Sequence, residues 1–372
     1  MQLTNRINFR NVQGDVFGGV TAAVIALPMA LAFGVASGAG AVAGLWGAVL
    51  VGFFAALFGG TPTLISEPTG PMTVVMTAVI ANLTAADPEN GLAMAFTVVM
   101  LAGVFQIVFG ILRLGKYVTM MPYTVISGFM SGIGVILVIL QIAPFLGQSS
   151  PKGGVVGTLQ RIPDLLASAQ PAETLLAAVT VAIIWFMPSR FKKVIPPQLI
   201  ALIVGTILSL VLIPVLFPGA AIRTIGVIPR EFPSLVMPTF SGDQLQLMFV
   251  DAAVLGMLGC IDALLTSMVA DSLTRTEHNS NKELIGQGLG NIISGLFGGI
   301  AGAGATMGTV VNIQAGGRSA LSGLTRAGVL LAVILGAANL AASIPMAVLA
   351  GIALKVGIDI IDWDFLKRAH KV

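Results

Sequence analysis

The sequence has 372 residues, of which 56% are hydrophobic and only 9% are charged, and its mean hydropathy is +0.97. Soluble domains carry about 25% charged residues, so this composition excludes a water-soluble protein and indicates a polytopic membrane protein. The formal net charge of +3 is too small for a nucleic-acid-binding protein, and the single cysteine excludes an intrachain disulfide.

No charged residue occurs between Asp15 and Glu67, and this stretch is long enough for two membrane spans. The small-residue run S-G-A-G at 37–40 predicts the break between them. Closely spaced prolines follow the second span and forbid a continuous helix there. We therefore predict an extended segment and then a short helix over residues 69–73, with Pro71 in its first turn.

The rest of the chain contains plainer hydrophobic segments, which predict spans near residues 91–112, 122–146, 172–189, 196–217, 244–271, 283–300, 318–341 and 344–362. With two short interrupted segments counted as crossings, the chain crosses the membrane about twelve times. Basic residues then gather on one side, at Arg113/Lys116, Arg190/Lys192/Lys193, Arg275/Lys282 and Lys367/Arg368/Lys371. The positive-inside rule therefore predicts that both ends of the chain lie in the cytoplasm.

The second interrupted segment begins with the glycine- and alanine-rich residues 298–304. Each glycine inside a helix costs about 1 kcal/mol relative to alanine, so we predict extended backbone followed by a half-length helix over Thr306–Gln314. Irregular backbone at membrane depth is tolerated only where it is buried in protein or lines a cavity. The helix N-terminus would bring about half a positive charge to that cavity, which favours an anion site. A glycine-kinked structural helix is the alternative.

The two interrupted segments resemble each other in sequence. T-G-P-M-T-V-V from Thr69 aligns with A-T-M-G-T-V-V from Ala305, so that Thr69 corresponds to Ala305 and Thr73 to Thr309. An odd number of crossings, seven, separates the two copies, so the repeats must be inverted in the membrane. Paired interrupted segments of this kind are typical of a transporter binding site.

Asp262 lies near the middle of a predicted span, where a charged side chain costs at least ~2.5 kcal/mol and needs a polar partner. Thr266 follows one turn later on the same helix face. A carboxylate, a hydroxyl and nearby free carbonyls form a set of hard oxygen ligands that suits Na⁺. The alternative is a buried aspartate that caps backbone N–H groups.

Four other charged residues lie within or beside predicted spans. Glu67 precedes the first short helix, and we predict that it caps the positive end of that helix, with a role in transport as the alternative. Arg326, Lys355 and Asp359 are predicted near span ends, where they would snorkel or pair.

Four stretches together resemble the SulP/SLC26 anion transporters, namely A-L-P-M-A-L-A-F-G from Ala26, S-E-P-T-G-P-M-T from Ser66, D-A-L-L-T-S from Asp262 and G-A-G-A-T-M-G-T from Gly302. The similarity runs through essentially the whole chain. It implies an all-α membrane fold of two inverted seven-helix repeats, in which the short third and tenth helices meet at the substrate site. The last two helices of the family's fourteen and its C-terminal STAS domain are expected to be absent from this chain.

The resemblance also implies two domains within the transmembrane region of residues 1–372. The core domain would comprise approximately residues 14–116 and 244–341, and the gate domain approximately residues 120–217 and 342–364. The site residues that it implies are Thr69 and Ala305 for the anion, Phe33 as a pocket-lining residue, and Asp262, Thr266, Gly304 and Thr306 for sodium. Animal relatives carry an arginine near the start of the tenth helix, which this sequence lacks; a bound cation would replace its charge.

These observations predict a Na⁺-coupled symporter of a small oxyanion, with bicarbonate as the preferred substrate. Two helix N-termini offer roughly one positive charge, which matches a monoanion. A proton-coupled sulfate symporter in which Asp262 carries the proton is the alternative. An uncoupled anion channel is less favoured, because it would not need Asp262 beside the anion.

The sequence predicts no enzymatic activity, because it shows no nucleophile–base pair and hence no catalytic residue. The expected setting is the inner (plasma) membrane, with several crossings and a cytoplasmic N-terminus. The expected partners are bicarbonate or a similar anion, Na⁺, the lipid bilayer and, in the full-length protein, a second copy in a homodimer.

Overall fold

A computed structural model describes residues 4–5, 9–118, 120, 122–151, 153–188, 190, 195–230 and 232–368. Within these ranges the chain is mostly helical, with a single two-stranded sheet at its centre. Three of the basic residues used for the orientation, Lys192, Lys193 and Lys371, lie outside the described residues.

The first part of the chain forms η1 (Phe9–Asn11), α1 (Val12–Ala36), α2 (Ala41–Phe58), β1 (Ser66–Glu67), α3 (Gly70–Ala86), α4 (Gly91–Ile111), α5 (Gly115–Val118) and α6 (Tyr123–Phe145). The middle part forms α7 (Gly154–Gln160), α8 (Ile162–Ala167), α9 (Pro171–Phe186), α11 (Pro197–Val211) and α12 (Ile213–Leu216). The last part forms α13 (Leu245–Thr274), α14 (Ser280–Leu296), β2 (Ala303–Gly304), α15 (Thr306–Gln314), α16 (Ala320–Ala342), α17 (Met346–Ile360) and α18 (Trp363–Arg368).

The predicted spans correspond to helices, and most of their bounds agree within a few residues. In the described part of the chain, six helices are long and apolar enough to cross a membrane, and α3, α9 and α11 are shorter apolar helices. The prediction was wrong about the length of α3, which has 17 residues instead of five. Pro71 lies in the first turn of α3, where a proline starts a helix and does not limit how far it continues.

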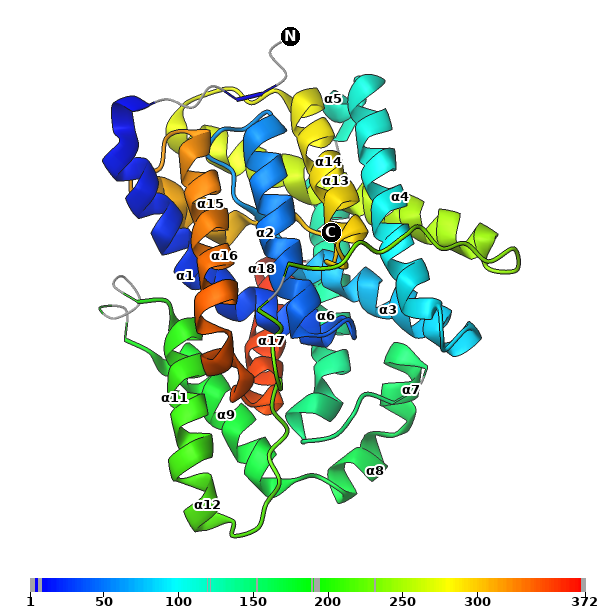
Figure 1. Cartoon of the computed structure of the whole chain (residues 1–372), viewed down its shortest axis with the longest axis vertical. Helices are drawn as coiled ribbons and strands as arrows, with labels where there is room; N and C mark the ends of the chain where they lie inside the picture. The colour runs from blue at the N-terminus through cyan, green and yellow to red at the C-terminus, as the bar shows by residue number, and fades with distance from the viewer. Residues whose placement is uncertain are drawn as a thin grey trace.

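The helices form two packed groups (Figure 1). In one group α14 packs against α2 and α4, and α1 packs against α2 and α16. In the other, α17 packs against α6 and α9, and α9 packs against α11. Contacts of α1 with α17, and of α3 with α6, join the groups. The strand pair β1–β2 belongs to the first group, because α2 packs against β1 and α13 packs against β2.

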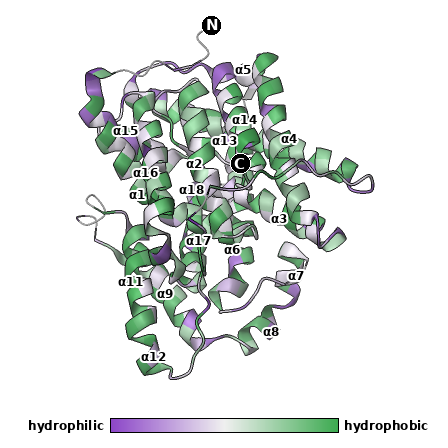
Figure 2. Cartoon of the chain, in the orientation of Figure 1, coloured by the Kyte–Doolittle hydropathy of each residue, from purple (hydrophilic) through white to green (hydrophobic). Residues whose placement is uncertain are grey.

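Helix α11 shows how the fold suits a lipid environment. Its exposed face carries large apolar side chains, including Ile203, Ile207 and Leu210, whereas the small or polar residues Gly205 and Ser209 are buried. This arrangement is the reverse of a water-soluble helix, and it leaves an apolar surface that hydrocarbon solvates without cost. Figure 2 shows that the helix bodies are mostly apolar and that hydrophilic residues occur mainly in connecting segments and at helix ends.

Candidate ion-binding site

The centre of the molecule is the antiparallel pair of β1 and β2. Ser66 pairs with Gly304, and Glu67 pairs with Ala303. The backbone N–H of Ala305 extends the ladder by donating to the carbonyl of Ile65 at 2.8 Å. Two segments that are more than 230 residues apart in the chain are therefore fixed to each other immediately before the helices that follow them.

Local sequence explains why these segments are extended. Pro68 restricts the residue before it, Glu67, to extended backbone. On the other strand, a β-carbon at Gly302 would lie 2.8 Å from the backbone of Glu67, and one at Gly304 would lie 3.0 Å from the Cα atom of Ala263. The glycines thus permit β2 to approach both β1 and α13.

Two helices begin where the strands end. Thr69 is the N-cap of α3 and Ala305 is the N-cap of α15, as the predicted correspondence of the two repeats requires. The equivalence extends one turn further, because Thr73 and Thr309 each donate a backbone N–H to the carbonyl of the respective N-cap at 2.9 Å. No described side chain accepts a hydrogen bond as the cap of either helix, so the first N–H groups of both remain available to a ligand.

The four residues expected to hold sodium lie next to these N-termini. On α13, the Asp262 carboxylate accepts a hydrogen bond from the Thr69 hydroxyl at 2.7 Å. One turn later the Thr266 hydroxyl donates to the Gly304 carbonyl at 2.9 Å and lies 2.9 Å from the Thr306 hydroxyl. The set therefore offers one carboxylate, two hydroxyls and one carbonyl, all hard oxygen ligands of the kind that small cations bind.

A cavity of about 460 Å³ connects these groups. Six of the seven expected site residues line it, namely Phe33, Thr69, Asp262, Gly304, Ala305 and Thr306. Thr266 is fully buried behind Gly304 and Thr306 and does not line the cavity. Thr306, in contrast, is exposed to it. A ligand in this cavity would thus meet both helix N-termini on one side and the oxygen cluster beside them.

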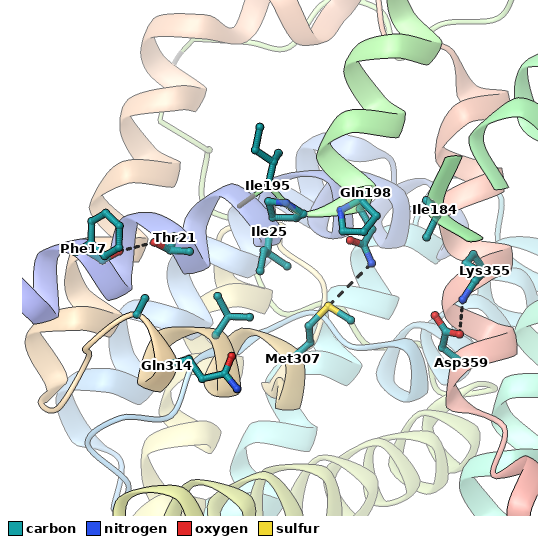
Figure 3. Close-up of a pocket in the computed structure, with 14 residues that line it drawn as sticks. Phe17, Thr21, Ile25, Ile184, Ile195, Gln198, Met307, Gln314, Lys355 and Asp359 are labelled. Atoms are coloured by element: carbon teal, nitrogen blue, oxygen red, sulfur yellow. Dashed lines mark hydrogen bonds and ion pairs between the residues drawn. The ribbon is translucent and has the colours of Figure 1, made fainter. Parts of the chain in front are cut away.

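Figure 3 shows the residues that line a second cavity, of about 930 Å³. This cavity adjoins the first. The two share Met307, Val311 and Asp359 as lining residues. The walls of the larger cavity come from the first half of α1, the end of α9, the start of α11, the whole length of α15 and the end of α17. The smaller cavity is therefore reached from that face of the molecule.

Arg326 and Glu67 form a buried ion pair, with 2.5 Å between the guanidinium and the carboxylate. The prediction that Arg326 would snorkel or pair is confirmed for the pairing, but Arg326 does not snorkel, because it is fully buried and also donates to the carbonyls of Ala48 and Ser66. The prediction for Glu67 was wrong, because Thr69 is the N-cap of α3. The pair holds β1 in place, because Glu67 and Ser66 both belong to this strand. The spacing of residues in the sequence does not predict that Arg326 and Glu67 are partners. Lys355 and Asp359 do pair, as predicted.

Other supporting residues were missed at the sequence level. Asn291 on α14 clamps Gly302 by accepting from its N–H at 2.8 Å and donating to its carbonyl at 2.9 Å. Gln287, one turn earlier, donates to the Ser66 hydroxyl at 2.6 Å. Both amides are fully buried, in the part of α14 that follows the polar first turn Ser280–Glu283. Their spacing of four residues on one face is the signal that would have indicated a polar contact inside the bundle.

Arg326→Met is expected to destabilise the protein by about 3–5 kcal/mol, because it leaves Glu67 as a buried charge without its partner. Thermal unfolding in detergent measures the effect. The exposed residue Arg275 provides the control, since Arg275→Met removes the same charge from a surface position. The double variant Arg326→Met/Glu67→Gln should recover part of the loss. A wild-type melting temperature for Arg326→Met alone would contradict this account of β1.

Comparison with known proteins assigns the chain to a family. The profile described as the sulfate permease family matches residues 12–372. Proteins named bicarbonate transporter BicA, from Synechocystis sp. and Picosynechococcus sp., are each 77% identical over the whole of this chain. The chain spans 65% and 66% of the lengths of these two relatives.

A solved structure described as the transmembrane domain of a cyanobacterial bicarbonate transporter, BicA, superposes with a TM-score of 0.96 at 75% identity. The match covers 100% of this chain and 94% of the solved one. The fold of that domain and the fold described above are therefore the same. Because the family profile matches almost every residue and the relatives agree along the full chain, this multi-pass membrane protein belongs to the sulfate permease family.

Proposed function

We propose that this chain forms the membrane part of a Na⁺-coupled symporter that carries bicarbonate into the cell. The observation that carries the proposal is the hydrogen bond between Thr69 and Asp262. Thr69 lies at a helix N-terminus, which suits an anion. Asp262 is the carboxylate of the oxygen cluster, which suits a cation, and the hydrogen bond therefore places the two proposed sites side by side. The names of the relatives that are 77% identical support bicarbonate as the anion.

The charges of the site favour a monoanion. The N-termini of α3 and α15 together offer roughly one positive charge, and Na⁺ at Asp262 would balance the carboxylate. In this proposal Thr69 and Ala305 contact bicarbonate and Phe33 closes the pocket, while Asp262, Thr266, Gly304 and Thr306 bind Na⁺. Sulfate would leave about one negative charge without compensation.

The two packed groups of helices support a division into two domains with different functions. We assign residues 14–116 and 244–341 to a core domain that holds both ions, and residues 120–217 and 342–364 to a gate domain. The N-terminus is assigned to the cytoplasm and the protein to the inner (plasma) membrane. With that orientation the larger cavity opens to the cytoplasm, because its walls include the first half of α1. The full-length protein is proposed to form a homodimer.

Uptake of radiolabelled bicarbonate and sulfate by the full-length protein, in Na⁺ and in choline, tests the proposal. We expect saturable bicarbonate uptake that requires Na⁺. Sulfate uptake that requires a proton gradient and not Na⁺ would replace the proposal with proton-coupled sulfate symport. Flux that does not saturate and depends on neither Na⁺ nor a proton gradient would indicate a channel.

A further inference from the structure

The contact between the two cavities carries a pair of opposite charges. Met307, Val311 and Asp359 line both cavities, and Lys355 lines the larger one. Lys355 and Asp359 lie one turn apart on α17, with the ammonium bonded to the carboxylate (Figure 3). The Asp359 side chain is 48% exposed and that of Lys355 is 12% exposed. An ion that moves between the cavities therefore passes this pair. We call the boundary between the cavities, formed by Met307, Val311, Asp359 and the adjoining Lys355, the neck.

Helix stability does not explain the pair. Asp359 is the last but one residue of α17, where the negative end of the helix dipole disfavours a carboxylate. In pairs four residues apart the acid is better placed before the base, whereas here Lys355 precedes Asp359. The pair instead lines the place where the two cavities meet. The position and the order of the two residues thus favour a role in ion passage.

Lys355 also has a second partner within reach. Its ammonium lies 5.4 Å from the centre of the Trp185 ring on α9. The face of an aromatic ring attracts a cation, though more weakly than a carboxylate does. Because of Trp185, the ammonium can turn from Asp359 towards a passing anion without becoming an isolated charge in an apolar wall.

We propose that Lys355 and Asp359 form an exchange site in the neck, where Lys355 binds the anion and Asp359 binds the sodium ion as the two pass. The inference rests on the proposed symport. A single fixed charge would attract one of the two ions and repel the other. The pair has no net charge, so it offers each ion a partner and excludes neither.

The two charges should act on different ions when they are removed one at a time. A unit charge about 8 Å away, at an effective dielectric constant near 30, changes the affinity for an ion by about tenfold. Lys355→Gln is therefore expected to raise the apparent KM for bicarbonate about tenfold without raising that for Na⁺. Asp359→Asn is expected to do the reverse. Uptake by the full-length protein into inside-out vesicles measures both constants, because the neck then faces the bath.

The double variant separates charge from structure. Lys355→Gln/Asp359→Asn removes the repulsion that the remaining charge exerts in each single variant but leaves neither ion its partner, so each KM should lie between that of the wild type and that of the more affected single variant. Lys355→Arg should behave as wild type. Lys367→Gln and Asp364→Asn, on α18 and outside both cavity linings, are the matched controls and should change neither constant. The exchange site would be refuted if each single variant raised the KM for bicarbonate and the KM for Na⁺ equally. It would also be refuted if the rise in KM in the double variant equalled the product of the rises in the two single variants.

A second measurement does not depend on transport. The single native cysteine, Cys260, is fully buried, so Asp359→Cys provides a thiol that water-soluble reagents can report. We expect an anionic reagent to modify this thiol faster while Lys355 is present than in the Lys355→Gln background, and a cationic reagent to show the opposite. If the thiol does not react, or if its modification rates are the same with and without Lys355, the proposed exchange site is refuted. Wild-type protein without Na⁺-dependent bicarbonate uptake would refute the proposed function instead.

Discussion

Asp262→Asn is expected to abolish the stimulation of bicarbonate binding by Na⁺ while leaving some Na⁺-independent binding. Without Na⁺, the Asp262 carboxylate is a negative charge beside the proposed anion site, since it accepts a hydrogen bond from Thr69. At about 6 Å and an effective dielectric constant near 20, the repulsion is roughly 3 kcal/mol, or about a hundredfold in affinity. Sodium cancels this repulsion, so each ion strengthens binding of the other by the same factor.

The variant is informative because asparagine preserves the local contact. Its side-chain oxygen still accepts the hydrogen bond from Thr69, whereas the charge and the principal cation ligand are lost. Anion affinity in Na⁺ and in choline, measured for the wild type and the variant, tests the prediction. Asp251→Asn, three turns earlier on α13, is the matched control and should keep the wild-type response. If Asp262→Asn retains its Na⁺ dependence, Asp262 is structural.

Ala305→Leu is expected to abolish transport while the protein remains folded. Ala305 lines the smaller cavity at the N-cap of α15, and its methyl group leaves the first N–H groups of the helix within reach. A leucine side chain would occupy the space of the anion without entering the packed core, because it extends into the cavity. We expect a loss of more than about a hundredfold in uptake, since the bound anion loses its contacts with α15.

The same substitution at the other end of the helix gives the control. Ala315 follows α15 and lines the larger cavity, which has room for a leucine. Ala315→Leu should therefore transport at nearly the wild-type rate, and both variants should elute as folded protein in detergent. Wild-type anion affinity in Ala305→Leu would show that the anion binds elsewhere.

The half-length helix and the pairing of the two repeats could be predicted from sequence because local chemistry determines both. Proline and glycine act on the backbone of their immediate neighbours, so the extended segments and the start of α3 follow from Pro68, Pro71 and the glycines before Thr306. The bounds of α15 agree with the prediction. Thr69 and Ala305 occupy equivalent N-cap positions for the same reason.

Contacts between distant segments could not be predicted in this way. The partner of Arg326 lies 259 residues away, and no periodicity within α16 indicates which buried group its guanidinium meets. The neck is a similar case, because the pairing of Lys355 with Asp359 is local but its place between two cavities depends on five separate helices. The assignment of core and gate domains, and of individual residues to the two ions, stays a prediction.

The pairing of Arg326 with Glu67 has a consequence for how the chain is made. Ribosomal synthesis completes the segment of Glu67 long before α16 emerges, so the acid is already in the membrane when the arginine arrives. Inserting an arginine into hydrocarbon costs about 2.5–3.5 kcal/mol, and this cost falls when the side chain finds a polar site inside a bundle. A buried acid from the first repeat therefore offers the arginine of α16 a partner that removes part of this cost once the two repeats have packed together.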